Sequence, residues 1–376
     1  MFEIRGTKIQ FKNDFLLTLI FFQLHGAGTT NPSKFFWQVQ DLMMERAKVP
    51  MFLTYRAVGS STGMKEFMGK IGTFEPLNDF GAGDIPMSAE RYANITGLAG
   101  REMVHIPFVT GAIAFFHSVP SSDYSGSALD LNACLLARIF SSEITTWDHQ
   151  DILDANPGFN PPAGQQILMA HRTKGSSSTT GISEYVGHFL MNVGCITHIT
   201  LKYNINNTSN KNTNRYLNST CPSGWSLDVG STVTWAGGEA VQGSGGMSDY
   251  IEANPYAIGY IDAGHGHNLG LSEIAVQNRD GNYLTSLEAD IASTISGLGN
   301  PFPPDSSSDF SGFNLYDLAG AQAWPVTMVT YLYVHESSSS KTIPPRESTS
   351  IFRTQVPAKE HDCDGSREMR SLESFR

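Results

Sequence analysis

Hydrophobic positions along the chain change between the spacing of strands and the spacing of helices. Residues 51–58 (MFLTYRAV) form a strand-like run, and apolar side chains then recur at Met64, Phe67 and Met68, as on one face of a helix. Helix starts are expected at three polar turns: Asn31-Pro32, Gly59-Ser60-Ser61 and 175–178. In the first of them Asn31 is the expected N-cap and Pro32 the first helical residue. Further strand-like runs lie at 105–116, 166–171, 257–261 and 328–334. Alternating strands and helices predict an α/β fold.

The two ends of the chain differ from this pattern. Residues 15–22 form a short apolar run after three basic residues, which fits either the core of a signal peptide or a buried first strand. From residue 336 onward the sequence is rich in serine and loses hydrophobic periodicity. Residues 336–376 are therefore expected to form a disordered polar tail.

Length and charge narrow the classes of protein. A chain of 376 residues is longer than one ordinary core supports, so two lobes are expected. No apolar run reaches the roughly 18 residues that a membrane span needs. The formal net charge of −11 argues against a nucleic-acid partner, because such proteins present a basic face.

A polar insertion suggests the compartment. Residues 203–220 are rich in asparagine, within an insertion placed at 196–220, and are flanked by Cys195 and Cys221. A disulfide between these two cysteines would restrain the loop. The chain also carries N-glycosylation sequons at Asn94, Asn206, Asn207 and Asn218. Together these features favour a secreted glycoprotein, extracellular or at the cell surface, or periplasmic if the source is bacterial.

Candidate chemistry lies in three turns of one kind. In each, a strand runs into a Gly/Ser/Thr turn that opens a helix: 28–31, 59–61 and 175–178. Such turns present unpaired backbone N–H groups and hydroxyls, with the positive end of a helix dipole behind them. Arg172 lies just before the third turn. The pattern predicts an oxyanion site.

These residues lie in a chain that resembles a known family, the PstS phosphate-binding proteins of the bacterial phosphate ABC importer. The resemblance runs from about residue 24 to 334. It is carried by ordered blocks: GAGTTNP (26–32), AVGSSTGMKEF (57–67), FGAGDIPMS (80–88), IPFVTGAIAFF (106–116), IFSSEITTWDHQDILDANPG (139–158), HRTKGSSSTTGISEY (171–185), GSTVTWAGG (230–238), NPYAIGYID (254–262) and AWPVT (323–327).

The resemblance implies a fold and a set of contacts. The fold would be a two-lobed type II periplasmic-binding-protein fold, with the ligand in a cleft between lobes joined by crossing strands. Lobe I would comprise 23–107 and 258–335, and lobe II 108–257. The partners would be inorganic phosphate and a membrane phosphate transporter, with the protein acting as a monomer. The implied phosphate contacts are Thr30, Asn31, Ser60, Asp84, Arg172, Ser176, Ser177 and Ser178.

Four positions, in three places, depart from the family pattern. Asn31 stands where the family usually has Phe, Lys174 where an acidic residue commonly pairs with the arginine, and Ser177-Ser178 where it has Gly-Thr. Asp84 fits an anion site because a carboxylate accepts the proton that phosphate keeps at neutral pH. Sulfate has no such proton and would meet Asp84 lone pair against lone pair.

Two alternatives come from other classes of protein. Residues 59–63 (GSSTG) fit the G-x-S-x-G turn of a secreted serine hydrolase, with Ser61 as nucleophile and His265 or His267 downstream. Too few residues precede this turn for the β-α units that normally come before it, so a non-catalytic protein without cofactor or metal is expected. The other alternative is a phosphate-binding surface sensor or adhesion protein, since the sequons favour a eukaryotic secreted relative.

Overall fold

The computed structural model describes residues 7–8, 18–19, 22–69, 76–95, 102–192, 227–298, 302–313 and 315–336. Near the N-terminus it places β1 (Thr7–Lys8) and β2 (Thr18–Leu19) as an antiparallel pair. Whether residues 1–22 are a signal or a first strand therefore stays a prediction. The insertion at 196–220 and the tail beyond residue 336 lie outside the described residues.

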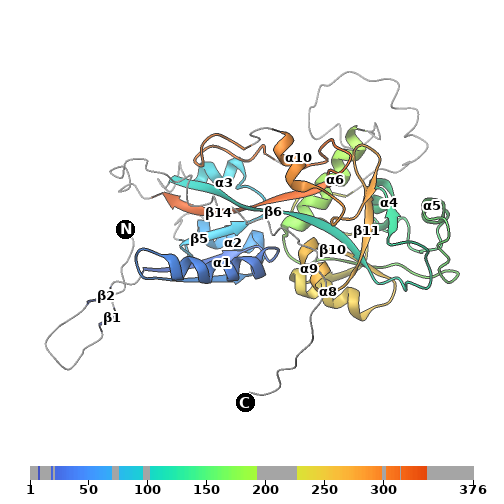
Figure 1. The fold of residues 1–376 in the computed structure, drawn as a ribbon, viewed down its shortest axis with the longest axis horizontal. Coiled ribbons are helices and arrows are strands. Elements are labelled where there is room, and N and C mark those ends of the chain that lie inside the picture. The colour runs from blue at the N-terminus through green and yellow to red at the C-terminus, as the bar shows by residue number, and fades with distance from the viewer. Residues whose placement is uncertain are drawn as a thin grey trace, which may run out of the picture. The chain divides into compact units, whose positions relative to one another are not determined.

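The N-terminal part of the chain builds one half of the molecule around parallel strands (Figure 1). Strand β3 pairs in parallel with β4 on one side and with β5 on the other. Helices α1 and α2 follow β3 and β4, as the sequence predicted. The elements of this half are β3 (Phe22–Gly28), α1 (Ser33–Arg46), β4 (Met51–Ala57), α2 (Ser60–Met68), β5 (Phe80–Gly83) and α3 (Ala89–Ala93).

Two long strands connect this half to the other. Strand β6 (Glu102–His117) pairs antiparallel with β14 (Val326–Glu336) along its first two thirds. Its last residues, from Ile113 to His117, pair instead with β10 (Ala257–Asp262). Strand β6 therefore passes from one half of the molecule into the other (Figure 1). The main path of hydrogen-bonded strands runs β4-β3-β5-β14-β6-β10-β8-β9.

The second half continues the sheet from β10 through parallel strands and adds helices. Strand β10 pairs in parallel with β8, and β8 with β9. Its elements are β7 (Leu129–Leu131), α4 (Ala133–Phe140), α5 (Gln150–Ala155), β8 (Leu168–Arg172), α6 (Ser177–Asn192), β9 (Glu239–Val241), α8 (Gly243–Ala253), α9 (Ala263–Asn268) and β11 (Ser272–Gln277). The short elements β12 (Tyr283–Leu284), α10 (Ile291–Gly297) and β13 (Leu315–Tyr316) lead back to β14.

Buried side chains form separate clusters in the two halves. The largest cluster includes Phe115, Phe140, Trp147 and Tyr260, around the end of β6 and β10. Smaller clusters pack beside α1 and α2. Ile258 and Ile261 also belong to the largest cluster, together with residues of 112–251. The lobe boundaries at 107/108 and 257/258 stay a prediction. The packing of Ile258 and Ile261 with residues of 112–251 bears on the boundary at 257/258.

The predicted strands and helices are present, and one predicted cap is wrong. Helix α1 begins at Ser33 with Pro32 in the N-cap position and without a side-chain cap. Asn31 does not cap the helix, because its amide oxygen, the atom that a cap uses, accepts instead from Ser178 Oγ and Ser244 Oγ, both at 3.3 Å. Its amide nitrogen donates to the carboxylate of Asp84 at 2.7 Å. The buried charge of Asp84 needs such donors, since a charge without partners in the interior is costly.

The predicted disulfide lies outside the described residues. Cys195 and Cys221 are not among them, and neither is Cys363. Cys134, at the start of α4, is disulfide-bonded. The chain has four cysteines. A bond between Cys195 and Cys221 therefore stays a prediction, and within one chain it requires Cys134 to be joined to Cys363.

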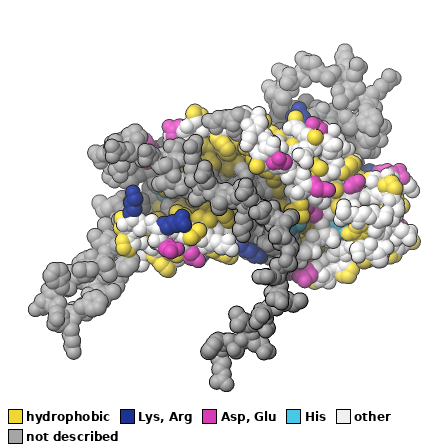
Figure 2. All heavy atoms as spheres, viewed as in Figure 1, with side chains coloured by type: hydrophobic (Ala, Val, Ile, Leu, Met, Phe, Trp, Pro, Cys, Tyr) yellow, Lys and Arg dark blue, Asp and Glu magenta, His cyan; other side chains and the backbone are white. Residues whose placement is uncertain are grey.

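The described residues cover part of the predictions about glycosylation sequons, surface charge and membrane spans. Of the four sequons, Asn94 alone is described, and it lies at the C-terminal cap of α3. On the face shown in Figure 2, charged side chains are scattered among uncharged ones, as expected from the 16% of charged residues. Among the described residues no helix is long and apolar enough to cross a bilayer.

Candidate functional site

Three turns of the first half meet at one edge of its parallel strands. Thr29, Thr30 and Asn31 follow β3, Ser60 opens α2 after β4, and Asp84 follows β5. The strands are adjacent and parallel, so their carboxyl ends lie at the same edge. This places the predicted contacts of the first half next to one another, as local strand–turn–helix chemistry suggested.

The second half brings its predicted contacts to the same place. Arg172 ends β8, and Ser176, Ser177 and Ser178 form the turn into α6. Hydrogen bonds join the halves directly: the Ser60 hydroxyl donates to Ser177 Oγ at 2.9 Å. The Asn31 amide nitrogen donates to Ser178 Oγ at 3.2 Å. Ser176 is buried, and its backbone N–H donates to the Ser231 carbonyl at 2.8 Å.

Asp84 lies at the centre of these turns and is 4% exposed. Its Oδ2 accepts hydrogen bonds from Thr29 Oγ1 at 2.5 Å, Ser177 Oγ at 2.5 Å and the Asn31 amide at 2.7 Å. Its Oδ1 accepts one from Thr330 Oγ1 at 2.6 Å. Burial raises the pKa of Asp84, whereas the four donors act in the opposite direction. All four donors are protein groups.

Arg172 differs from Asp84, because few hydrogen bonds and no ion pair stabilise its buried charge. The side chain is 8% exposed, and its Nη2 donates to Thr30 Oγ1 at 3.4 Å. Its Nη1 is buried and has no hydrogen-bond partner. No ion pair joins Arg172 to a carboxylate among the described residues. Burial lowers the pKa of the guanidinium, the direction expected for a cation removed from water. Such a group is strongly stabilised by an anion.

Two cavities flank the cluster of Asp84 and the serine hydroxyls. The Arg172 cavity, of about 220 Å³, is lined by Thr30, Ala57, Val58, Gly59, Arg172, Lys174, Gly175, Gln242, Gly243, Ser244 and Gly245. Its lining has two cations and no carboxylate. It is therefore the cavity that suits an anion.

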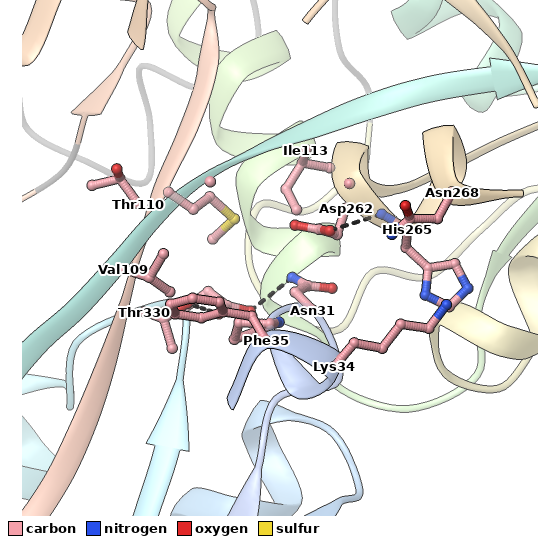
Figure 3. Close-up of a pocket in the computed structure, with 15 residues that line it drawn as sticks. Asn31, Lys34, Phe35, Val109, Thr110, Ile113, Asp262, His265, Asn268 and Thr330 are labelled. Carbon is pink, nitrogen blue, oxygen red and sulfur yellow. Dashed lines mark hydrogen bonds between the residues drawn. The ribbon is translucent and has the colours of Figure 1, made fainter. Parts of the chain in front are cut away.

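The Asp262 cavity lies on the other side of Asn31 and has a volume of about 200 Å³. Figure 3 shows Asn31 and Asp262 facing it, with Lys34 and His265 toward one end and Thr330 toward the other. Asp84 also lines it. The predicted contacts are thus divided: Thr30 and Arg172 line the Arg172 cavity, and Asn31 and Asp84 line the Asp262 cavity. The four predicted serines line neither cavity.

Asp262 should make stability depend on pH. Burial raises its pKa to about 7, the His265 N–H opposes this, and the charge of Asp84 adds to it. A carboxyl whose pKa is raised by folding stabilises the fold below its unfolded value near 4, and this contribution is lost as pH rises through 7. Asp262→Asn should therefore flatten the loss of melting temperature between pH 5 and 8.

Thermal unfolding of both proteins at several pH values measures this effect. Burial also raises the pKa of Glu273 to about 7, but Glu273 is present in both proteins, so the difference isolates Asp262. Parallel curves for wild type and Asp262→Asn would contradict the prediction.

Sequence reasoning missed four residues of the cluster. Thr29 and Thr330 both donate to Asp84, and Asp262 lines the second cavity. Ser244 Oγ lies 3.0 Å from Thr30 Oγ1. Residues 242–245 (QGSG), where β9 leads into α8, have the same strand–turn–helix pattern as the three turns that were found. That pattern was a usable signal for Ser244, whereas nothing in the strand sequence marks Thr330.

The arrangement does not support a hydrolase at Ser61. Its hydroxyl donates to Ser231 Oγ at 3.5 Å, and no hydrogen bond joins it to a histidine among the described residues. His265 Nε2 lies 3.3 Å from Ser248 Oγ, and His267 Nε2 lies 2.9 Å from Ser286 Oγ. A serine nucleophile needs a base within hydrogen-bond reach. The described residues also contain no cluster of His, Cys, Asp and Glu able to hold a metal.

Comparison with known proteins agrees with this architecture. The family model of the PBP superfamily domain matches residues 19–341. The phosphate-binding protein PstS of Haemophilus influenzae is 24% identical over 289 residues, covering 77% of this chain and 71% of that protein. The phosphate-binding protein PstS3 of Mycobacterium bovis is 25% identical over 295 residues, covering 77% and 67%.

A solved structure is similar in fold. The crystal structure of a phosphate binding protein from Stenotrophomonas maltophilia aligns with a TM-score of 0.54 at 15% identity, covering 83% of this chain and 78% of that one. The likeness confirms the predicted α/β, two-lobed fold with crossing strands, which here are β6 and β14.

Proposed function

Because the chain belongs to the PBP superfamily, we propose that it binds inorganic phosphate between its two lobes and does so without catalysis. The observation that carries the proposal is Arg172, a buried guanidinium whose Nη1 has no partner and which lines a cavity free of carboxylates. A planar guanidinium holds two oxygens of a phosphate at once. An anion in this cavity would compensate the buried charge.

The surrounding turns supply the remaining donors. A phosphate that leaves water must exchange its hydrogen bonds for fixed ones. Thr30 and the N-terminus of α2 at Ser60 contribute from one lobe, and the turn at Ser176–178 contributes from the other. Helix N-termini hold phosphate because their first N–H groups lack partners. The predicted contacts Ser177 and Ser178 remain part of the proposed site through their backbone N–H groups at the start of α6. The backbone N–H of Asn31 donates to Thr29 Oγ1 at 3.2 Å, so it would have to exchange this partner for the phosphate.

The relatives suggest what the binding is for. They are named as phosphate-binding proteins PstS. We accordingly propose uptake or scavenging outside the cytoplasm, with delivery to a membrane phosphate transporter, by a protein that acts as a monomer. The sequons favour a eukaryotic secreted protein. A surface sensor or adhesion protein with the same site is the second candidate, and it would bind phosphate without passing it on.

Isothermal titration of the full chain with phosphate, sulfate and arsenate tests the proposal. We expect saturable binding of phosphate with one site per chain, and no saturation by sulfate at the same concentrations. Absence of phosphate binding at millimolar concentrations would overturn the proposal. Equal affinities for phosphate and sulfate would support an oxyanion site but contradict the proposed specificity for phosphate.

A further inference from the structure

We propose that Ser244 and the first turn of α8 form a further part of the binding site and donate to the same anion as Arg172. The proposal rests on the proposed function, because it concerns the same ligand. It adds a fourth turn to the three that the sequence indicated. Ser244 lies in the lobe of β8 and β9 but contacts residues of the other lobe.

The side chain of Ser244 is placed inside the cluster of ligand contacts. It is 2% exposed and lines the Arg172 cavity. Its hydroxyl lies 3.0 Å from Thr30 Oγ1 and donates to Asn31 Oδ1 at 3.3 Å. Arg172 Nη2 also donates to Thr30 Oγ1. Ser244 and Arg172 therefore approach the same hydroxyl from one lobe.

The backbone at the start of α8 has donors to offer. The helix spans 11 residues, Gly243–Ala253, and its N-cap residue Gln242 makes no side-chain cap. The first N–H groups of a helix have no partner within it, and the helix dipole places positive potential there. Gly243 and Gly245 line the cavity without side chains that would keep an anion away from the backbone.

A second observation, independent of the helix, points to an anion in this cavity. The buried Nη1 of Arg172 has no partner, and Arg172 lines the same cavity as Gly243, Ser244 and Gly245. Gly59, at the start of α2, faces it from the other lobe with a positive φ of 97°. An anion in the cavity is thus reached by two helix N-termini and a guanidinium.

Gly245 offers a test in which loss of binding is separated from loss of folding. A Cβ added there meets nothing within 4 Å, and the backbone is not in the left-handed region. Aspartate in the first turn of a helix stabilises the helix. Gly245→Asp should leave the melting temperature without ligand unchanged or higher. It should weaken phosphate binding at least tenfold, because it adds a carboxylate at the cavity.

Two comparisons isolate the cause. Gly245→Asn has nearly the same shape, so the difference in affinity between the Asn and Asp variants reports the charge. Ser244→Ala should weaken phosphate binding about three- to tenfold, the loss of one hydrogen bond. Ser248→Ala is its matched control, since Ser248 is buried one turn later in α8, does not line the cavity and donates to the Gly245 carbonyl.

Titration of phosphate into wild type and the four variants, with melting curves without ligand, decides between the outcomes. Weak binding by Gly245→Asp and Ser244→Ala, with normal binding by Ser248→Ala, supports the inference. If wild type binds phosphate and both Gly245→Asp and Ser244→Ala bind it equally well, the inference is overturned and the proposed function stands. If wild type does not bind phosphate, the proposed function itself fails, and the inference fails with it.

Discussion

Arg172→Lys should weaken phosphate binding about ten- to hundredfold although the net charge of the protein is unchanged. The lysine ammonium keeps the charge but loses the planar fork that holds two oxygens. The loss of one charge-assisted hydrogen bond, about 1.5–3 kcal/mol, corresponds to this range. Titration of phosphate into the two proteins measures it. Undiminished affinity would remove Arg172 from the site.

Two further variants define the role of the charge. Lys174→Ala removes the other cation of the Arg172 cavity, and a smaller loss is expected because Lys174 contributes only to the field. Arg172→Met removes a buried charge that has no ionic partner, so it should abolish phosphate binding without lowering the melting temperature of the free protein. Arg56→Lys is the control, since Arg56 is exposed and pairs with Glu66.

Asp84→Asn should reduce the preference for phosphate over sulfate at least tenfold. A carboxylate accepts the proton of phosphate and repels the lone pairs of sulfate, whereas an amide can donate to a sulfate oxygen. Titration of both anions into both proteins gives the ratio of affinities. The exposed carboxylate Asp249 provides a control, Asp249→Asn, with the same change of charge. If the ratio of phosphate to sulfate affinity is the same in wild type and in Asp84→Asn, Asp84 does not accept the phosphate proton.

In the structure both oxygens of Asp84 already accept hydrogen bonds, which limits how the carboxylate can accept the proton of phosphate. Its Oδ2 already accepts from Thr29, Asn31 and Ser177, and its Oδ1 from Thr330. Asp84 lines the Asp262 cavity and not the Arg172 cavity, so a phosphate held by Arg172 can contact it only by replacing one of these donors. Ser177 is the natural one to yield, because its hydroxyl also accepts a hydrogen bond from Ser60 and can turn toward a ligand. Ser177→Gly should then leave the preference for phosphate intact while freeing one lone pair of Asp84.

The sequence alone determined the parts of the site that depend on neighbours in the chain. The strand–turn–helix segments at Thr30, Ser60 and Ser177 follow from local hydrophobic spacing and from small polar residues at helix starts. Arg172 was marked by its place before the third turn, and the resemblance to the PstS family added Asp84. In each half these residues lie at the ends of adjacent parallel strands, and hydrogen bonds between the halves join them. The α/β class could be predicted for the same reason.

Only the tertiary structure decided how these side chains are partnered. Thr330 donates to Asp84 across 246 residues of chain, and Ser244 to Asn31 across 213, because sheet order brings them together. Asn31 looked like a helix cap, but its side chain bonds instead to Asp84, Ser178 and Ser244. The burial of Arg172 without an ionic partner, on which the proposed anion site rests, also appears only once both lobes are folded. Local sequence sets backbone conformation, whereas burial and pairing are set by distant segments.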